Sequence, residues 1–216
     1  MTHADDDGMI IPPRLAPSHI VIIPITFKAD DPEAILNYCH KLADDLGVLN
    51  YHGRNVTVEI DNRDIRGGEK TWGWIKKGIP IRLEVGPRDM DSDSVFMARR
   101  DKSAKEKQGV PRVEFIETVT DILDDIQQGL FDRALARREE ATIVIDSKED
   151  FYTHFEGDGI GFVYAHFCGD PAIEDEIKTD LKVTLRCIPL HGHDEEGVCI
   201  FTGKPSKQRV LWAKSY

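Results

Sequence analysis

The sequence predicts an α/β protein, in which a mixed sheet with flanking helices is followed by a smaller unit of α+β type. Strand and helix patterns alternate from residue 19 to about residue 115, which is typical of an α/β layer with a mainly parallel or mixed sheet. A long helical pattern then covers residues 118–138, and short strands and helices restart after Ala141. We therefore expect two compact units joined through the long helix.

The first elements are predicted from prolines and from an apolar run. Residues 1–18 are acidic and then rich in proline, so we expect an extended segment there. The apolar run at 20–27 does not alternate with polar residues, which predicts a strand covered on both faces. Asp31 and Pro32 supply an N-cap and a first-turn proline for a helix that ends at Gly47.

The elements that follow are predicted from alternation and from helical spacing. A short helix ends at Gly78, and the polar segment 102–109 is interpreted as a hairpin tip. Alternating apolar residues predict strands with one wetter face. In this part of the chain we expect strands at 56–60, 81–85, 95–99 and 110–115, and helices at 69–77 and 118–138.

The last third of the chain predicts a second set of short elements. Asp170 and Pro171 supply an N-cap and a first-turn proline for one of its helices. The predicted strands are 142–145, 160–167, 184–189, 198–201 and 209–213, and the predicted helices are 147–155 and 170–181.

The composition is that of an ordinary globular chain, with 40% hydrophobic and 31% charged residues. No apolar run approaches the roughly 20 residues needed to span a bilayer, so we expect no contact with a membrane. The N-terminus is acidic and lacks the positive region of a secretory signal. The four cysteines are too few and too scattered for a disulfide framework. We therefore expect a cytoplasmic protein.

The most distinctive segment is residues 72–89, WGWIKKGIPIRLEVGPRD, which interrupts an acidic chain. The net charge of the whole chain is −11, yet residues 54–88 contain eight Lys or Arg against five Asp or Glu. A local positive excess of this kind indicates an anionic partner. Part of the excess has a simpler explanation, because Lys76 and Lys77 end a helix, where the helix dipole favours cations.

Four segments together resemble one family, the prolyl-tRNA synthetases. They are GMIIPPRLAPSHIVIIPI (8–25), KKGIPIRLEVGPRD (76–89), RRD (99–101) and TGKPSKQRVLWAKSY (202–216). The resemblance covers essentially the whole chain in one order. It is to the C-terminal half of the archaeal and eukaryotic-cytosolic type, which is also found in some bacteria.

The resemblance implies the anticodon-binding fold of class II synthetases, with a mixed five-stranded sheet and flanking helices. Residues 1–17 would be an extended segment from the end of the catalytic domain, residues 18–117 the anticodon-binding domain and residues 118–216 the C-terminal domain. The catalytic domain would precede Met1, and Met1 would then be either an internal methionine taken as a start or the boundary of a cloned fragment. The parent enzyme would attach proline to tRNA(Pro) with ATP and Mg²⁺. This chain alone, which contains no phosphate-loop or nucleophile-elbow motif, would not catalyse that reaction.

The resemblance also implies which residues face the anticodon: Arg63, Lys70, Lys77, Arg82, Glu84 and Arg88. The proline anticodons share two guanines, and Arg or Lys pairs with guanine O6 and N7. A carboxylate such as Glu84 accepts from the N1–H and N2–H₂ groups of guanine, and further lysines neutralise phosphates. Trp72 and Trp74 are interpreted as half-buried packing residues rather than stacking platforms.

Many members of the family hold a structural zinc ion through four cysteines of the last domain. Cys168 and Cys199 match one cysteine of each pair, whereas the partner positions are Ile173 and Thr202. Structural zinc needs four sulfur or nitrogen ligands, so we expect vestigial cysteines and no zinc. The open alternative is a replacement set drawn from Cys187, His191, His193 and His166.

The partners that the resemblance implies are tRNA(Pro) and the enzyme's own catalytic domain, near whose active site Tyr216 would lie. The alternative for Tyr216 is a final edge strand with no role in catalysis. The parent enzyme is expected to be a homodimer and the 216-residue chain a monomer. Two other functions stay open: a free-standing RNA-binding or regulatory module derived from a synthetase, and a protein-interaction domain whose acidic surface docks a basic partner.

Overall fold

A computed structural model of the chain describes residues 2–27, 29–157, 159–191 and 195–214. The chain forms two compact units, Met1–Ala134 and Leu135–Tyr216. The sequence suggested a domain boundary at residue 118, near the start of the long helix, whereas the compact units divide inside that helix. Among the described residues, no helix combines the length and the apolar character needed to cross a membrane.

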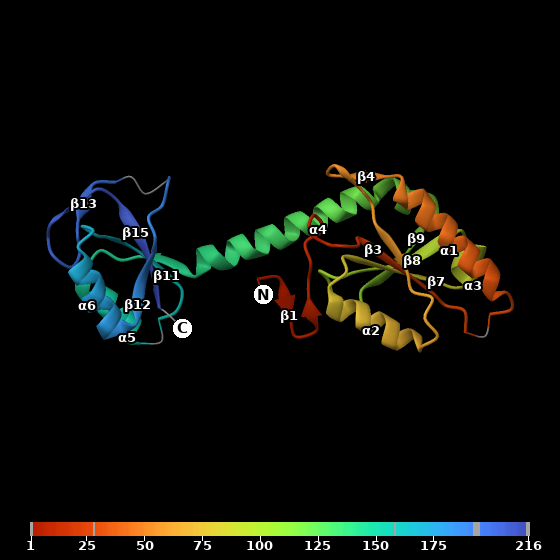
Figure 1. Cartoon of the computed structure of the whole chain (residues 1–216), viewed down its shortest axis with the longest axis horizontal. Helices are drawn as coiled ribbons and strands as arrows, with labels where there is room; N and C mark the ends of the chain where they lie inside the picture. Colours follow the sequence, from red (N-terminus) through yellow and green to blue (C-terminus); the bar gives the residue numbers. More distant parts are fainter. Residues whose placement is uncertain (1, 28, 158, 192–194, 215–216) are drawn as a thin grey trace. The chain divides into compact units, whose positions relative to one another are not determined.

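The first unit is built on a mixed sheet of five strands (Figure 1). In chain order these are β3 (Ile20–Pro24), β6 (Val58–Ile60), β7 (Ile81–Val85), β8 (Ser94–Arg99) and β9 (Lys107–Pro111). Their order in the sheet is β6-β3-β7-β8-β9. β3 runs parallel to β6 and β7, and the pairs β7–β8 and β8–β9 are antiparallel. The predicted α/β fold with a mixed five-stranded sheet is therefore confirmed.

Two helices cover one face of this sheet and build the larger core. α1 (Pro32–Gly47) and α4 (Arg112–Glu140) bury their apolar sides against β-strand residues that include Ile20 and Ile22. The start of α1 is as predicted, because the Asp31 carboxylate accepts a hydrogen bond from the Ala34 N–H at 2.9 Å.

A third helix, α2 (Gly67–Lys77), covers part of the opposite face. Trp74 of α2 packs against Val21, Ile23 and Ile79, which form a smaller cluster of their own. Because side chains alternate along a strand, β3 contributes to the cores on both faces, as expected of an apolar run without alternation.

The structure corrects two predicted strands. The strand predicted over 198–201 is limited to Gly197–Val198 (β13), because the residues after it form a turn closed by the hydrogen bond from Gly203 N to the Cys199 carbonyl. The other correction lies in the first unit. The sequence predicted a strand over 110–115, but β9 ends at Pro111 and α4 begins at Arg112. The apolar residues after Pro111 recur at steps of three or four rather than two, so they share one face of a helix. The buried residues of that face are Phe115, Val119, Leu123, Ile126 and Leu130.

The N-terminal segment, predicted to be extended, contains a short hairpin of β1 (Ala4–Asp5) and β2 (Gly8–Met9). The buried guanidinium of Arg100 donates to both carboxylate oxygens of Asp5, at 2.7 and 2.5 Å. The hairpin also packs on Gly78, the residue after α2, whose φ is +75°. A Cβ added to Gly78 would lie 2.6 Å from a backbone oxygen of β2, so both the conformation and the space require glycine.

A second small hairpin, β4 (Asn50–Tyr51) and β5 (Arg54–Asn55), follows α1. Arg54 donates to the backbone carbonyl of Ala16 at 2.6 Å, and its Nη2 lies 2.7 Å from Nε2 of the fully buried His19. These contacts fix the proline-rich segment that leads into β3.

The second unit contains a four-stranded sheet and a separate two-stranded hairpin. The sheet strands are β10 (Thr142–Val144), β11 (Phe162–His166), β12 (Val183–Cys187) and β15 (Arg209–Lys214), in the order β10-β11-β15-β12. The helices are α5 (Lys148–Glu156) and α6 (Pro171–Leu181), and the hairpin is β13 (Gly197–Val198) with β14 (Pro205–Ser206).

The core of the second unit is aromatic. The fully buried ring of Trp212 makes edge contacts with Phe151, Phe167 and Phe201, with centroid separations of 5.7, 5.1 and 5.8 Å. Such pairs stabilise a core beyond the burial of their area. A small unit therefore obtains a large part of its buried surface from few side chains.

Candidate nucleic-acid interface

The carboxyl ends of the parallel strands β3, β6 and β7 lie at one edge of the first unit's sheet. Ile22 of β3 pairs with Ile60 of β6 and with Leu83 of β7, so the three strands end close together. In open α/β sheets, ligands bind outside the carboxyl ends of the parallel strands. The basic part of the sequence supplies the loops and helix starts at this edge.

A groove of about 390 Å³ opens at this edge, between the start of α2 and the sheet. A Cβ added at Gly67 or Gly68 would meet no atom within 4 Å, so the first turn of α2 leaves its backbone open to the groove. No side chain of the described residues caps this helix, and free N–H groups of a first turn attract anions and acceptor atoms. The groove is lined by Ile25, Gly67, Gly68, Thr71, Trp72, Glu84 and Lys107.

Glu84 and Lys107 form the charged part of the groove. They lie on β7 and β9, on either side of β8, and Lys107 Nζ is 2.6 Å from Glu84 Oε1. The side chain of Lys107 is 27% exposed and that of Glu84 is 22% exposed. Phe96 of β8 pairs with Glu84 in the sheet, and its ring centroid lies 5.8 Å from Lys107 Nζ. A hydrogen-bond acceptor and a donor are thus presented side by side to an incoming ligand.

The two tryptophans of α2 have different environments. Trp74 donates from Nε1 to Asp61 Oδ2 at 2.8 Å and belongs to the small core under the helix. Trp72 is 44% exposed and lines the groove, with Lys76 Nζ 5.7 Å from its ring centroid. The sequence predicted packing roles for both, and the surroundings of Trp74 are those of a packing residue. Trp72 instead offers a partly exposed ring to a ligand.

Asp61 fixes the loop that leads into α2. Its carboxylate is 1% exposed and accepts hydrogen bonds from Arg63 Nε at 2.8 Å and Nη2 at 2.6 Å. The hydrogen bonds from Arg63 hold the pKa of Asp61 well below its ordinary value, against burial, which raises it, and Trp74 adds to the lowering. The backbone carbonyl of Asp61 accepts from Lys70 Nζ at 3.0 Å. The loop is therefore held from both sides.

Lys70 and Arg82, both predicted to face the anticodon, are buried in this structure. Lys70 is 7% exposed, and its ammonium group donates a hydrogen bond to the backbone carbonyl of Asp61. Arg82 is 2% exposed, on the same face of β7 as Glu84. Its Nη1 and Nη2 have no hydrogen-bond partner among the described residues, and burial and the nearby charge of Arg100 lower the pKa of Arg82.

The other predicted residues lie at the surface, at two separate places. Arg63 and Arg88 are exposed near the carboxyl ends of the strands, at the edge of the sheet where the groove opens. Lys77 is the last residue of the 11-residue helix α2, about 15 Å from its first residue at 1.5 Å per residue. Its Nζ lies 4.2 Å from the Trp74 ring centroid. The structure therefore brings Glu84, Arg63 and Arg88 to one edge and leaves Lys77 at the other end of α2.

Lys107 is a candidate that the sequence did not predict. It was part of the polar hairpin segment, and its contact with Glu84 joins residues on strands that are not adjacent in the sheet. The available signal was the alternation of β9, which would have placed Lys107 on a defined face once the hairpin register was known.

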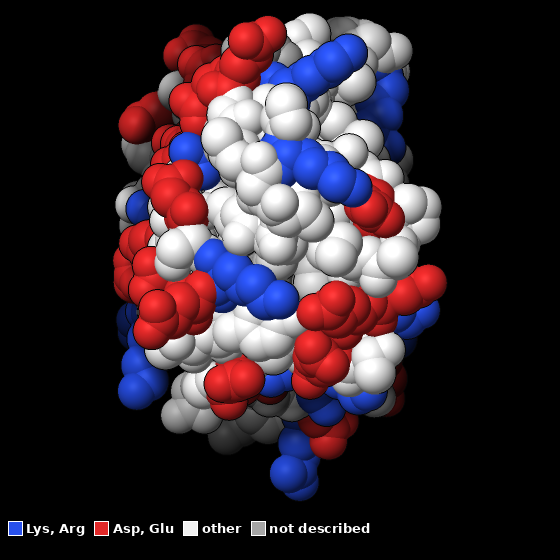
Figure 2. All heavy atoms as spheres, turned by 90° about the vertical axis from the view of Figure 1, so that its left-hand side faces the viewer, with Lys and Arg blue, Asp and Glu red and all other residues white. Residues whose placement is uncertain are grey.

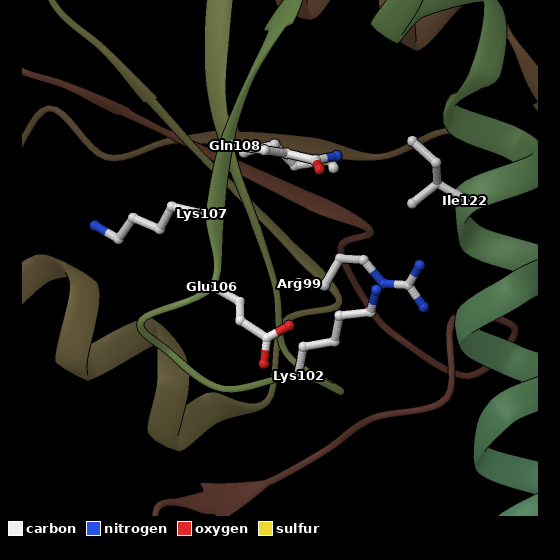
Figure 3. Close-up of a pocket in the computed structure, with 7 residues that line it drawn as sticks. Arg99, Lys102, Glu106, Lys107, Gln108 and Ile122 are labelled. Atoms are coloured by element: carbon white, nitrogen blue, oxygen red, sulfur yellow. The ribbon is translucent and has the colours of Figure 1, made fainter.

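A second hollow, of about 260 Å³, lies between the β8–β9 hairpin and α4 (Figure 3). Arg99 points toward α4, where its guanidinium is paired with Asp101 at 2.8 Å and with Asp125 at 2.6 Å. Gln108 points toward the same helix, whereas Lys107 points to the other side of β9. Arg99 is therefore compensated by two carboxylates on this side of the hairpin, and Lys107 is paired with Glu84 on the other.

The charge of the second unit is differently arranged. Figure 2 looks onto the end of the molecule that carries this unit and shows separate basic side chains among uncharged atoms, with acidic side chains along the left and in the lower part of the view. A surface that binds nucleic acid through phosphates is expected to carry a continuous basic patch. The face shown in Figure 2 carries no continuous basic patch.

The residues that match the family's zinc ligands do not fit a structural zinc ion. Cys168 Sγ lies 3.5 Å from Thr202 Oγ1, and Ile173 packs against the core beside Cys168 and Cys199. Two thiols, a hydroxyl and an apolar side chain do not supply four sulfur or nitrogen ligands. Within the described ranges, no group of three or more His, Cys, Asp or Glu is arranged to hold a metal ion.

The replacement set is not gathered into a site either, as far as its described members go. Cys187 is exposed on β12, and His166 is buried on β11 with Nδ1 3.1 Å from Ser206 Oγ. His193 lies outside the described residues, and so does Tyr216.

Comparison with known proteins identifies both parts of the chain. Residues 19–122 match the model of an anticodon-binding domain, and residues 148–216 match that of the C-terminal domain of prolyl-tRNA synthetase. The chain is 50% identical to proline–tRNA ligase 2 of Anaeromyxobacter dehalogenans, over all of this chain and 44% of that protein. It is 46% identical to proline–tRNA ligase of Bdellovibrio bacteriovorus and 44% identical to that of Akkermansia muciniphila, again over its full length, which spans 44% and 43% of those proteins. The chain thus spans less than half the length of the curated relatives it matches.

Proposed function

The chain contains the anticodon-binding and C-terminal domains of the prolyl-tRNA synthetase family, and on that premise we propose that its groove reads a guanine of the tRNA(Pro) anticodon. The observation that carries this proposal is the Glu84–Lys107 pair, at 2.6 Å, in a groove that opens at the carboxyl ends of the parallel strands.

The chemistry of the pair matches the Watson–Crick edge of guanine. That edge presents one acceptor, O6, next to two donors, N1–H and N2–H₂. The Glu84 carboxylate would accept from both donors, while the Lys107 ammonium would donate to O6. Adenine offers a carboxylate only one donor on this edge, and uracil and cytosine likewise lack two adjacent donors. Guanine is therefore the base that satisfies both side chains.

The rest of the groove fits an unstacked base and its phosphate. Single-stranded bases are commonly held by stacking on aromatic side chains, and Trp72 is the aromatic residue that lines the groove. The open first turn of α2 at Gly67 and Gly68 would attract a phosphate oxygen. Arg63 and Arg88 would neutralise phosphates at the same edge, and Lys77 a more distant one. We propose that Lys70 and Arg82, which are buried, support the residues that line the groove and do not contact the base themselves.

We further propose the enzyme context of this recognition. The whole protein would ligate proline to tRNA(Pro) with ATP and Mg²⁺, through a catalytic domain outside these residues. It would be a cytoplasmic homodimer of the type shared with archaea and the eukaryotic cytosol, although the relatives named above are bacterial. Residues 18–117 and 118–216 would be its last two domains, with Tyr216 near the active site and the isolated chain a monomer.

The test is a binding cycle with the full chain and transcripts of tRNA(Pro). Affinity is measured for the unchanged transcript and for transcripts in which each anticodon guanine in turn is replaced by adenine. The unchanged chain should lose about 1–3 kcal/mol with the adenine at the position read by Glu84. In Glu84→Gln, the carboxamide cannot accept from two donors in the same way, so this preference should shrink or vanish.

The matched control is Glu117→Gln, the same change of charge at an exposed position of α4. It should leave both the affinity and the guanine preference as they are. If Glu84→Gln keeps the preference of the unchanged chain at both guanines, the groove does not read guanine through Glu84. Lys107→Met then tests the donor to O6 independently.

A further inference from the structure

The β1–β2 hairpin lies beside the end of α2, the helix whose start lines the groove (Figure 1). A Cβ added to Gly8, whose φ is +130°, would lie 2.8 Å from the Cα atom and from the carbonyl oxygen of Lys76. Gly78 approaches the backbone of Met9 just as closely, and the Ile11 N–H donates to the Gly78 carbonyl at 3.1 Å. The hairpin and the end of α2 therefore interlock through their backbones.

One buried guanidinium joins the hairpin to the helix. Arg100 is 4% exposed, and its Nε donates to the carbonyl of Ile75 in α2 at 3.0 Å. Its Nη1 and Nη2 donate to the carboxylate of Asp5 in β1, and Nη2 also donates to the carbonyl of Gly8 in β2 at 3.2 Å. The hydrogen bonds from Arg100 hold the pKa of Asp5 below its ordinary value, so the contact is an ion pair at neutral pH. A single side chain thus contacts the helix and both strands of the hairpin.

A second buried cation lies on the same face of the sheet. Arg82 pairs with Ala98 of β8, and the Arg100 N–H donates to the Pro80 carbonyl at 2.9 Å, which extends this pairing by one residue. Because side chains alternate along a strand, Arg82 and Arg100 project from one face. The Arg82 Nη1 and Nη2 atoms have no hydrogen-bond partner among the described residues. The Asp5 carboxylate therefore compensates positive charge at a place where two guanidinium groups are buried.

The hairpin is small, but the contact that holds it is costly to break. Its strands are two residues long and mostly exposed, so it can open locally while the core stays folded. When it opens, Arg100 loses the carboxylate with which the described residues pair it. A buried charge without a partner is strongly unfavourable, so Arg100 must move toward water. That movement breaks its hydrogen bond to Ile75 and loosens the end of α2.

We propose that Asp5 and Arg100 are positioning residues of the groove, which act by latching the hairpin to the end of α2. The docked hairpin fixes the helix over the sheet, and the helix in turn places Trp72 and the open first turn at Gly67 and Gly68. Opening of the hairpin loosens this side of the groove and lowers its affinity for RNA. The effect on RNA rests on the proposed function of the groove, whereas the effect on α2 does not.

The latch is tested first on the full chain without RNA, by amide hydrogen exchange followed by NMR. Asp5→Asn removes the negative charge and one acceptor oxygen. Exchange of the Ile11 N–H and of the Gly78 N–H, which donates to carbonyls of Trp74 and Ile75 at the end of α2, should become about tenfold faster. Asp5→Glu keeps the carboxylate and should restore most of the protection.

Two comparisons show whether the effect is local. Asp6→Asn makes the same change at the exposed turn of the hairpin and should leave exchange as it is. The Val56 N–H, which donates to the Leu49 carbonyl at 2.9 Å, should exchange alike in every variant. Three results of Asp5→Asn overturn the proposal: no faster exchange, faster exchange at Ile11 without Gly78, and equally faster exchange at Val56, which means a general loss of stability.

With tRNA(Pro) the coupling must appear in both directions, because coupling between two binding events is reciprocal. Asp5→Asn should bind the transcript about fivefold more weakly or worse. Its preference for guanine over adenine should persist, because Glu84 and Lys107 lie on the sheet rather than on α2. The transcript bound to the unchanged chain should slow exchange of the Ile11 N–H relative to that of Val56. A hairpin that only stabilises the fold does not respond to RNA in this way.

The latch and the function of the groove fail in different ways. If the unchanged chain binds no tRNA(Pro), the function assigned to the groove is wrong, and the exchange rates measured without RNA still decide the latch. If the unchanged chain and Asp5→Asn bind tRNA(Pro) equally well, the function of the groove stands and Asp5 is not a positioning residue.

Discussion

At the scale of single residues, the Glu84–Lys107 pair is suited to exchange partners. Solvent-exposed ion pairs contribute only about 0–1 kcal/mol to stability, because water competes with them, and this pair lies between that case and a buried one. Both side chains keep contact with solvent, at 22% and 27% exposure for Glu84 and Lys107. A base that offers an acceptor to the lysine and donors to the carboxylate can therefore replace the ion pair at small cost. A fully buried pair would resist the same exchange.

A buried histidine should make the stability of the first unit depend on pH. Burial lowers the pKa of His19 from 6.5 to about 4, and the charge of Arg54 adds to the lowering. Between those values the unfolded chain binds a proton that the folded chain excludes. The free energy of unfolding should therefore fall as the pH falls from about 6.5 to about 4, by at most about 3 kcal/mol. Urea unfolding at several pH values across this window measures it.

The control for this effect is a histidine on the surface. His19→Gln should flatten the fall in stability between about pH 6.5 and pH 4, whereas His40→Gln, at an exposed position of α1, should not. Carboxylates with lowered pKa, such as Asp61, contribute at lower pH, because they lose stability only below their unfolded pKa. An unchanged pH dependence in His19→Gln would mean that another group causes it.

At the scale of the elements, Asp61 decides where α2 begins. Its buried carboxylate accepts hydrogen bonds from Arg63, which lies before the helix, and from Trp74, which lies inside it. Asp61→Asn removes the negative charge and turns an amide N–H₂ toward donors. We expect the first unit to lose about 1–3 kcal/mol of stability and tRNA affinity to fall as the groove loosens. Chemical unfolding and tRNA binding measure the two effects.

The comparison for Asp61 lies in the same loop. Asp64→Asn makes the same change at an exposed carboxylate and should leave stability within about 0.5 kcal/mol. If both variants behave alike, the contacts of Asp61 do not hold α2 in place.

Strand β7 illustrates what could be predicted from the sequence. Its alternation correctly predicted a strand with Ile81, Leu83 and Val85 on one side, and therefore Arg82 and Glu84 on the other. Alternation carries no information on which part of that other side a helix covers. Arg82 is fully buried and Glu84 partly exposed only because of how α2 and the hairpins pack. The sequence therefore predicted that Arg82 and Glu84 share one side of β7, but not that one of them is buried and the other partly exposed.

The same limit applies to α4 and β9. The apolar residues of α4 correctly predicted a long helix, but the residues of its first turn, up to Phe115, were assigned to the preceding strand. Lys107 could be matched with Glu84 only after the register of three strands was known. Contacts between strands that are not neighbours in sequence depend on topology, which local patterns do not contain.

At the scale of the whole molecule, we expect tRNA binding without chemistry. The described residues contain an anticodon-binding unit and a second small unit, and the curated relatives are more than twice as long as this chain. Binding and activation of proline would belong to the remaining part of such proteins. The 216-residue chain should therefore bind tRNA(Pro) and fail to support proline-dependent exchange of pyrophosphate into ATP.

Both measurements are made on the same preparation, so that the binding signal proves the protein is folded. Exchange above the background of a no-protein control would show that an activating site exists within these residues, whereas absence of tRNA binding by protein that circular dichroism shows to be folded would remove the anticodon assignment. Salt dependence adds a third readout, because affinity that rests on phosphate contacts falls steeply as salt rises, while the guanine preference assigned to Glu84 should persist.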